Sequence, residues 1–542
     1  NPPRSFGRVT IDWLLKGNRF CRIRKKEQSG NMPLTNLSGS VPDFTIFRLV
    51  PSIKIYDDML MKHAFFRKMG FGLGPDDEIP ADPVAWAEKQ VETVPDMSWP
   101  GDIPTAKELL DQRATFVYQD RRVLRKKYKN DRKAYKDAKT QLRWQTGEKY
   151  YESLEIAIRH HTALNSGAPV FERLWMFWHN HFAIAEKDML GCWNTGAYTR
   201  EIIRPNMCGS FTDLVKAVTT SWTMIAHLDN SESVGPNSKR GRWKRERGEV
   251  ATVNENHARE LLELHTVSPA AGYTQKDVVA LSYVMAGWEN RWSKKREECN
   301  PVHFEPKSHE PGNHVVMGKR YKQRGLSAKS KLTDVIEDLC AHPSCAEFVS
   351  TKLVRHFVTD DVTPEMVQPV IDAWTKSDGD LPTVYKALIR VVYEHTGTHK
   401  KFLNPEVWFL QSVKVAGVDW PPTPDEMQYD FKSRPEGKPN RPKSVMYGLG
   451  HHPYKPSQPN GWPDTEAEWL SPELLIRRLA MARRMSANGI RQQVLPQTVP
   501  ANFDNASEVF SYLKKIKDTK SDFYTRAADA HYLLSSEWML KV

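Results

Sequence analysis

Apolar residues recur at the 3.6-residue spacing of α-helices through most of this chain, from about residue 58 onward. Start signals support several of the helices, such as Thr274 before QKDVVALSYVMAGW and Ser471-Pro472 before ELLIRRLAMARR. The pattern predicts a mostly α fold: a large multi-helix body with irregular insertions. We expect helices within 105–150 and over 151–164, 169–185, 199–226, 254–267, 274–287, 328–340, 343–358, 364–376, 382–395, 404–415, 472–487, 506–517 and 521–534.

Two stretches break the helical pattern. Residues 290–327 carry turns and short alternating runs, which predict a possible small β-hairpin. Residues 421–463 contain ten prolines, too many for a continuous helix, and are typical of a functional loop or a strap over the surface. The expected organisation is an N-terminal extension (1–57), a helical core (58–485) that includes both stretches, and a C-terminal helical segment (486–542).

Composition limits the class of protein. Of the 542 residues, 39% are hydrophobic and 27% charged, and no apolar run reaches the ~18 residues that a membrane helix needs. A soluble protein without a transmembrane segment is therefore expected. The P-loop, a GxGxxG opening a helix after a strand and CxxCH are all absent, so we expect no nucleotide cofactor and no covalent c-type haem.

The charge is strongly basic. Lys and Arg number 78 against 66 Asp and Glu, a formal charge of +12, which favours an anionic partner such as an anionic polymer, a glycan or a membrane surface. Residues 121–139 hold ten Lys/Arg and two Asp, and we expect them on the solvated face of a long helix. Residues 239–247 hold six Lys/Arg and one Glu, and an exposed loop is expected there.

Six cysteines are too few for a disulfide scaffold. Cys340 and Cys345 flank a short AHPS turn. They could close a small disulfide loop in an exported protein, or remain two thiols at a helix junction, and the sequence favours neither.

Several strings resemble the bacterial domain-of-unknown-function 1800 family over roughly 58–485. They are ERLWMFWHNHFAI, HLDNSES, NENHARELLELHT, GYTQKDVVALSYVMAGW, FEPKSHEPGNHVVMG, HPSCAEFVSTKLVRHFV and YGLGHHPYKPSQPNGWPD. The resemblance implies a large helical protein, often exported, so a periplasmic or extracellular location is expected while the cytoplasm stays open. It also implies a possible partner from the domain-of-unknown-function 1501 family, which resembles phosphatases and sulfatases. His257 departs from the Tyr or Phe that the family usually has at this position.

The first candidate site lies on the expected helix 254–265. Its polar residues fall in one arc, opposite leucines and His265. In one interpretation this arc is solvated, with Arg259 pairing with glutamates four residues away and His265 in the core. In the other the arc points inward. There Asn256, Glu260 and Glu263 offer oxygen ligands or a general acid/base, and Arg259 keeps the carboxylates ionised or binds an anion. Spacing alone favours the first interpretation, and the family resemblance favours the second.

The second candidate is the Trp-His-Asn-His stretch. Side chains at i and i+2 diverge on a helix, so His179 and His181 would bind one metal together only if the helix ended there. We rather expect one of them to meet the Glu260/Glu263 face, with His265 as a third possible ligand. Such ligands suit a divalent metal ion, namely zinc, manganese or iron.

Other residues are weaker candidates. Trp288 and Trp462 could contact a substrate, whereas Trp175 and Trp178 are expected in the core. The turn His309–Gly312, His160-His161 and Arg355-His356 are interpreted as structural. At most one of His451 and His452 is expected to be functional.

These observations favour an enzyme with a buried His/carboxylate site, possibly a metal-assisted hydrolase of an anionic or sugar-like substrate. The alternative is a non-catalytic structural or assembly subunit that binds an anionic partner through basic surfaces. Nucleic-acid binding is a third hypothesis, which depends only on the net charge and the two basic runs. The sequence predicts no oligomeric state.

Overall fold

The structure is a computed structural model that describes residues 61–73, 77–184, 191–291, 300–323, 329–416, 418–427, 441–491 and 537–542. The expected extension 1–57 lies outside these ranges, as do the helices expected over 506–517 and 521–534. Within the described ranges, no helix combines the length and the apolar character that crossing a bilayer requires.

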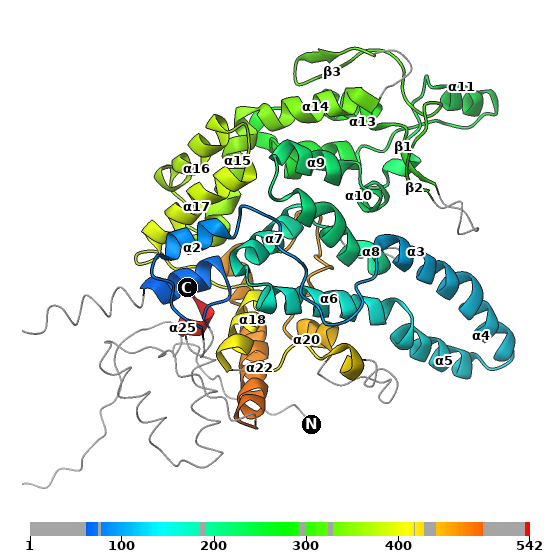
Figure 1. Cartoon of the computed structure of the whole chain (residues 1–542). Coiled ribbons are helices and arrows are strands. Elements are labelled where there is room, and N and C mark those ends of the chain that lie inside the picture. The colour runs from blue at the N-terminus through cyan, green and yellow to red at the C-terminus, as the bar shows by residue number, and fades with distance from the viewer. Residues whose placement is uncertain are drawn as a thin grey trace, which may run out of the picture. The chain divides into compact units, whose positions relative to one another are not determined.

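The fold is mostly α, as predicted (Figure 1). Residues 61–69 are helical. The helices that follow in the first half are α2 (Pro83–Lys89), α3 (Ala106–Ala114), α4 (Arg121–Lys127), α5 (Arg132–Gln145), α6 (Glu148–Asn165), α7 (Pro169–His181), α8 (Gly191–Tyr198), α9 (Phe211–Thr219), α10 (Trp222–His227), α11 (Lys239–Glu246), α12 (Asn256–Glu260) and α13 (Gln275–Met285). The second half contains α14 (Lys329–Ala341), α15 (Pro343–Phe357), α16 (Pro364–Lys376), α17 (Leu381–His395), α18 (Pro405–Ala416), α20 (Pro442–Gly448), α21 (Glu466–Trp469), α22 (Pro472–Arg491) and α25 (Glu537–Leu540).

The irregular stretch after α13 forms two small antiparallel pairs, where the sequence predicted one hairpin. Strand β1 (Trp288–Arg291) pairs with β2 (Asn300–Phe304), and β3 (His314–Val316) pairs with β4 (Lys319–Tyr321). In the first pair Trp288 lies opposite Phe304, and in the second His314 lies opposite Tyr321. Both pairs lie at the top right of Figure 1, close to α11 and α13.

Helix α7 contributes to two hydrophobic clusters. Its Trp175 and Trp178 are fully buried, as expected, in the larger cluster, which also contains residues of α15 and α17. Its Met176 belongs to the second cluster, which residues of α18, α20 and α22 build. The polar residues of α7 therefore lie where the two clusters meet.

Local signals explain where several helices begin and end. Thr274 and Asp277 form a reciprocal capping box at the start of α13, and α22 begins at Pro472, as the sequence predicted. Helix α7 ends at His181, four residues earlier than expected.

Three local predictions were wrong. Most of the run 239–247 forms helix α11 (Lys239–Glu246) rather than a loop, because Ser238 caps the helix by accepting from the Gly241 amide. The basic run 121–139 is a pair of helices, α4 and α5, rather than one long helix. The segment 254–265 is only partly α-helical, because a π-helical turn (Leu261–His265) follows α12.

Cys340 and Cys345 are both free and buried, so the structure has two thiols there rather than a disulfide.

The proline-rich segment, here called the strap, is described over 421–427 and 441–463. Its second part crosses α7. The side-chain amide of Asn180 donates to the carbonyl of Trp462 (2.8 Å), and its oxygen accepts from the Trp462 amide (2.7 Å). Gly461 makes this approach possible, since a Cβ there would lie 2.5 Å from the Asn180 carbonyl oxygen. The strap is thereby fixed on α7 beside buried polar residues.

Candidate functional site

The two histidines of the Trp-His-Asn-His stretch enter different surroundings. Nδ1 of His179 accepts from Nη1 of Arg159 (2.9 Å), and its ring lies 5.1 Å from that of Tyr454. His181 points elsewhere, and its Nε2 lies 3.2 Å from the carbonyl oxygen of His265. The divergence is the one expected for residues i and i+2 of a helix.

His181 and His265 do come together, with ring centroids 6.4 Å apart. Both are buried, and burial lowers the pKa of His265 to about 3 and that of His181 well below its usual value. Across the described ranges, no group of three or more His, Cys, Asp or Glu side chains is arranged to hold a metal ion. The metal-binding role of His179, His181 and His265 stays a prediction.

The polar face of the Asn-Glu-Asn segment does not turn inward, so that expectation was wrong. Asn256 is exposed, and the side chain of Arg259 is 39% exposed, donating to Glu255 (3.2 Å) and Gln275 (2.9 Å). Glu260 and Glu263 are only partly buried, and Glu263 accepts from the Tyr273 hydroxyl (3.3 Å).

The physical reason is hydrophobic burial. Ala258, Leu261 and Leu262 fill the core side of this segment, and the segment must turn its polar side outward to bury them. The catalytic roles of Asn256, Arg259, Glu260 and Glu263 stay predictions.

A different carboxylate lies among buried histidines. Glu406, at the start of α18, accepts from Nε (2.8 Å) and Nη2 (3.2 Å) of Arg159, and Nε2 of His160 lies 3.2 Å from its Oε1. Burial alone would raise the Glu406 pKa, but Arg159 and His160 outweigh burial and hold it well below its usual value. We call Arg159, His160, His179, Glu406 and Tyr454 the Glu406 cluster.

His160 is fully paired within this cluster. Its Nδ1 accepts from Nε1 of Trp420 (3.0 Å), so its Nε2 carries the proton that it donates to Glu406. Burial lowers the His160 pKa. These contacts fit the structural role that the sequence predicted for this residue.

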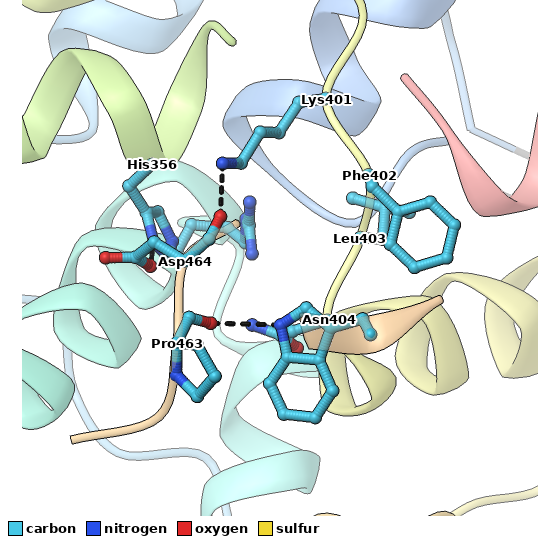
Figure 2. A pocket seen from close by; sticks show the side chains of 9 residues that line it. His356, Lys401, Phe402, Leu403, Asn404, Pro463 and Asp464 are labelled. Atoms are coloured by element: carbon cyan, nitrogen blue, oxygen red, sulfur yellow. Dashed lines mark hydrogen bonds and ion pairs between the residues drawn. The ribbon is translucent and has the colours of Figure 1, made fainter. Parts of the chain in front are cut away.

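A small cavity lies next to the strap, with about 20 Å³ open to the centres of water molecules. His356 of α15 and Asp464, directly after the strap, line it, and His356 Nδ1 lies 2.7 Å from Asp464 Oδ1 (Figure 2). A buried water needs roughly 10–15 Å³ of such space, so the cavity has room for about one. Its complete lining is Arg173, His356, Lys401, Phe402, Leu403, Asn404, Pro463, Asp464 and Trp469.

The charge states of this pair follow from burial and neighbouring cations. Burial lowers the His356 pKa, Asp464 partly offsets this, and Arg173 and Lys401 lower it further. Burial would raise the Asp464 pKa, but His356, Lys352 and Lys401 together bring it below its usual value. At neutral pH the pair is therefore a neutral imidazole beside a carboxylate.

The two ring nitrogens of His356 differ in their surroundings. Its Nε2 is buried and has no hydrogen-bond partner among the residues that the structure describes. Because Nδ1 faces a carboxylate, the proton of the neutral ring belongs on Nδ1, and Nε2 has a free lone pair. This arrangement is that of a general base oriented by an aspartate.

Two cations border the same cavity. The ammonium of Lys401 contacts the Asp360 carboxylate and the backbone oxygen of Asp464, and Figure 2 shows it pointing at Asp464. Arg173, on α7, donates to the carbonyl of Lys68 (3.3 Å), and its Nε has no partner within the described residues. Lys401 is already paired with a carboxylate, so Arg173 is the cation of this cavity that can attract an anion.

The sequence interpretation missed this pair. His356 was assigned to a plain helix face, because it lies 108 residues from Asp464 and no spacing rule joins the two. Both residues nevertheless belong to strings that carry the family resemblance, HPSCAEFVSTKLVRHFV and YGLGHHPYKPSQPNGWPD. That shared membership was the available signal.

The two candidate tryptophans lie outside this cavity lining. Trp462 stacks near His451, with ring centroids 4.8 Å apart, and donates from Nε1 to the His452 carbonyl (2.9 Å). Trp288 begins β1, and its carbonyl accepts from Asn230 (2.8 Å). Their role as substrate contacts stays a prediction.

Comparisons with known proteins agree with the resemblance seen in the sequence. A family model with the description "Protein of unknown function (DUF1800)" matches residues 64–539. No curated protein and no solved structure matches the chain.

Proposed function

Since this chain belongs to the DUF1800 family, whose description assigns no activity, we propose from its own geometry that it is a hydrolase in which His356 and Asp464 activate water. The substrate class we propose is an anionic ester, with an acyl or phosphoryl centre. A sugar-like substrate that carries such a group falls within the proposal.

The proposed reaction uses the ionisable residues of the cavity. Asp464 holds the His356 proton on Nδ1, and Nε2 accepts a proton from the water in the cavity. Because the cavity holds only the water, the ester meets it at the open side of the cavity. The water oxygen then bonds to the electrophilic centre, and the proton on Nε2 passes to the departing oxygen as its bond breaks. Arg173 attracts the anionic group of the substrate, and Lys401, held by Asp360, fixes the backbone of Asp464.

One observation carries the proposal. A buried imidazole nitrogen without a hydrogen-bond partner lowers the stability of the fold unless a water or a ligand bonds to it. Here that nitrogen belongs to a histidine that is oriented by Asp464 at 2.7 Å and borders a cavity of one-water size. The Glu406 cluster supports no such step, because Glu406, Arg159 and His160 are already bonded to one another.

The test is hydrolysis of 4-nitrophenyl phosphate and 4-nitrophenyl acetate by the purified full chain. His356→Gln and Asp464→Asn are each expected to lower the rate by about 10²–10⁴-fold, the usual contribution of a general base. His395→Gln is the matched control, since His395 lies outside the cavity lining. Thermal melting of each variant separates a loss of folding from a loss of chemistry. Wild-type rates in both cavity variants, or no hydrolysis of either probe by the wild type, would contradict the proposal.

A metal-assisted form of the reaction extends the proposal. Zinc, manganese or iron is predicted from histidine ligands, among His179, His181 and His265, together with the carboxylates of Glu260 and Glu263. Elemental analysis of the purified chain, together with hydrolysis rates before and after dialysis against EDTA, tests this form. A stoichiometric metal whose removal lowers the rate supports it, and a metal-free active chain contradicts it.

A non-catalytic structural or assembly subunit is the second candidate. The observation that favours it is the pairing inside the Glu406 cluster, which resembles a buried structural ion pair. A periplasmic or extracellular location and a partner from the domain-of-unknown-function 1501 family also stay predictions. Co-purification with a tagged copy of such a partner, in the absence of any hydrolysis, would favour this candidate over the enzyme.

A further inference from the structure

Helices α4 and α5 form a basic hairpin at the right edge of Figure 1. The segment 121–139 contains ten Lys/Arg and two Asp, and neither helix has a buried residue. We call α4, α5 and the turn between them the basic hairpin. Trp144, near the end of α5, packs partly buried against a small hydrophobic cluster, but none of the ten cations of 121–139 is buried, so the core does not explain this concentration of charge.

Helices α4 and α5 pack against each other through their partly buried sides. Leu124 of α4 and Ala134 and Ala138 of α5 are half-buried. Tyr135 accepts hydrogen bonds from Arg125 and Arg121, which lower its pKa although burial would raise it. The lysines lie mainly on the other, exposed sides, so the outer surfaces of both helices are cationic.

This charge has little internal compensation. Asp131 is used at the start of α5, where its carboxylate accepts from the Ala134 amide (2.9 Å). Lys126, Lys133 and Lys136 make no ion pair with any residue that the structure describes. Arg122 and Lys126, like Arg132 and Lys136, are like charges four residues apart, a spacing that destabilises a helix. An anionic ligand would relieve this repulsion.

We propose that the basic hairpin binds the phosphate backbone of double-stranded nucleic acid, without reading its sequence. One helix of 10–12 Å diameter, such as α5, fits a major groove about 12 Å wide, where its cations can meet the phosphates that line both walls. A helix that inserts into a membrane surface needs an apolar face, whereas the large exposed apolar side chains of 115–145 are only Tyr118 and Val123. The proposal does not depend on the His356–Asp464 pair.

The test measures binding of the full chain to a fluorescent 30-base-pair DNA duplex by anisotropy, between 50 and 200 mM salt. Each phosphate contact contributes about 0.9 to the slope of log K against log salt. Replacing Lys126, Lys133 and Lys136 by Glu is expected to weaken binding at least tenfold and to reduce the slope by about 2.7. These side chains are exposed, so the variant should melt like the wild type.

The control changes net charge equally at another place. Lys276, Lys322 and Lys376 are exposed, lie outside the hairpin and make no ion pair with a described residue, and replacing them by Glu should leave most of the affinity. Equal losses in the two triple variants would show that net charge alone binds DNA and would overturn the proposal. Tighter binding to phosphatidylglycerol vesicles or to heparin than to the duplex would also overturn it. His356→Gln should bind DNA normally, so this test fails or succeeds independently of the hydrolase test.

Discussion

Nδ1 of His356 and Oδ1 of Asp464 lie 2.7 Å apart, although α15 supplies the first and the residue directly after the strap supplies the second. Asn180 of α7 fixes the strap two residues before Asp464 through both polar groups of its amide. The pairing of His356 with Asp464 therefore depends on how the strap is seated. This dependence gives the first two predictions.

Asp464→Asn should shift the pH dependence of hydrolysis. Asp464 raises the His356 pKa against the effect of burial, so its removal lowers that pKa further. Because the neutral imidazole is the base, the acid limb of the rate profile should move to lower pH, while the maximal rate falls because Nδ1–H loses its partner. Initial rates between pH 4 and 9 measure both effects. An unchanged acid limb would mean that His356 is not the titrating base.

Gly461→Ala should displace the strap from α7. A Cβ at this position would lie 2.5 Å from the Asn180 carbonyl oxygen, and its φ of +83° already disfavours alanine. We expect a loss of about 2–4 kcal/mol in the free energy of unfolding, since strain and a steric clash add together. Denaturant unfolding measures this loss.

Gly272→Ala is the matched control for that variant. Gly272 has a similar φ of +73°, but an added Cβ would meet nothing within 4 Å. The free energy of unfolding of this variant should fall only by the cost of backbone strain, about 1 kcal/mol. Equal losses in the two variants would show that the approach of the strap to α7 is not tight.

Glu406→Gln should destabilise the fold strongly. It leaves the buried Arg159 guanidinium without its carboxylate, a change that costs about 3–5 kcal/mol in comparable buried pairs. Glu88→Gln, which breaks the more exposed pair with Arg390, should change stability little.

The pH dependence of this contribution follows from the Glu406 pKa. That pKa is well below its usual value of 4.5 in the folded chain, so the stabilisation is complete above about pH 4.5 and is lost as the pH falls through the folded value. Chemical denaturation at pH 7 and at pH 3 should therefore show a smaller difference between wild type and variant at the lower pH.

The helical architecture followed from sequence because its causes are local. The 3.6-residue period, Thr274 and Pro472 predicted elements that the structure contains. The same approach failed at 254–265, where the angles of a regular helix were applied to a segment that turns into a π-helix at Leu261. It also failed at 239–247, where the cap Ser238 and the close packing of Gly241 produce a helix from strongly charged residues.

The His356–Asp464 pair and the Glu406 cluster consist of residues that are far apart in the sequence. Local periodicity does not predict such contacts. The divergence of His179 and His181 was predictable from helix geometry alone. The partner of His179 was not predictable in this way, because Arg159 comes from α6. The carboxylate beside Arg159, that of Glu406, lies 247 residues further along the chain. The charged face of Asn256 and Arg259 was placed inward on the strength of the motif, whereas the burial of Leu261 and Leu262 decided its direction.

His257 provides the last prediction. Both of its ring nitrogens are buried without a hydrogen-bond partner in the described part of the chain, and burial lowers its pKa to about 3. The resemblance places Tyr or Phe at this position, which fits an apolar site. His257→Phe should therefore raise the free energy of unfolding at pH 7 by about 1–3 kcal/mol, the cost of an unpaired buried polar group.

The pH dependence sharpens this test. The unfolded chain binds a proton at His257 near pH 6.5, whereas the folded chain does so only near pH 3, so wild-type stability falls as the pH is lowered between these values. The variant lacks this proton, and its advantage should grow from pH 7 to pH 5. His161→Phe is the matched control: because His161 is hydrogen-bonded to the Ser98 carbonyl (2.7 Å), its replacement should destabilise the chain. A loss of stability in His257→Phe at both pH values would mean that the histidine has a partner or a shape that phenylalanine cannot replace.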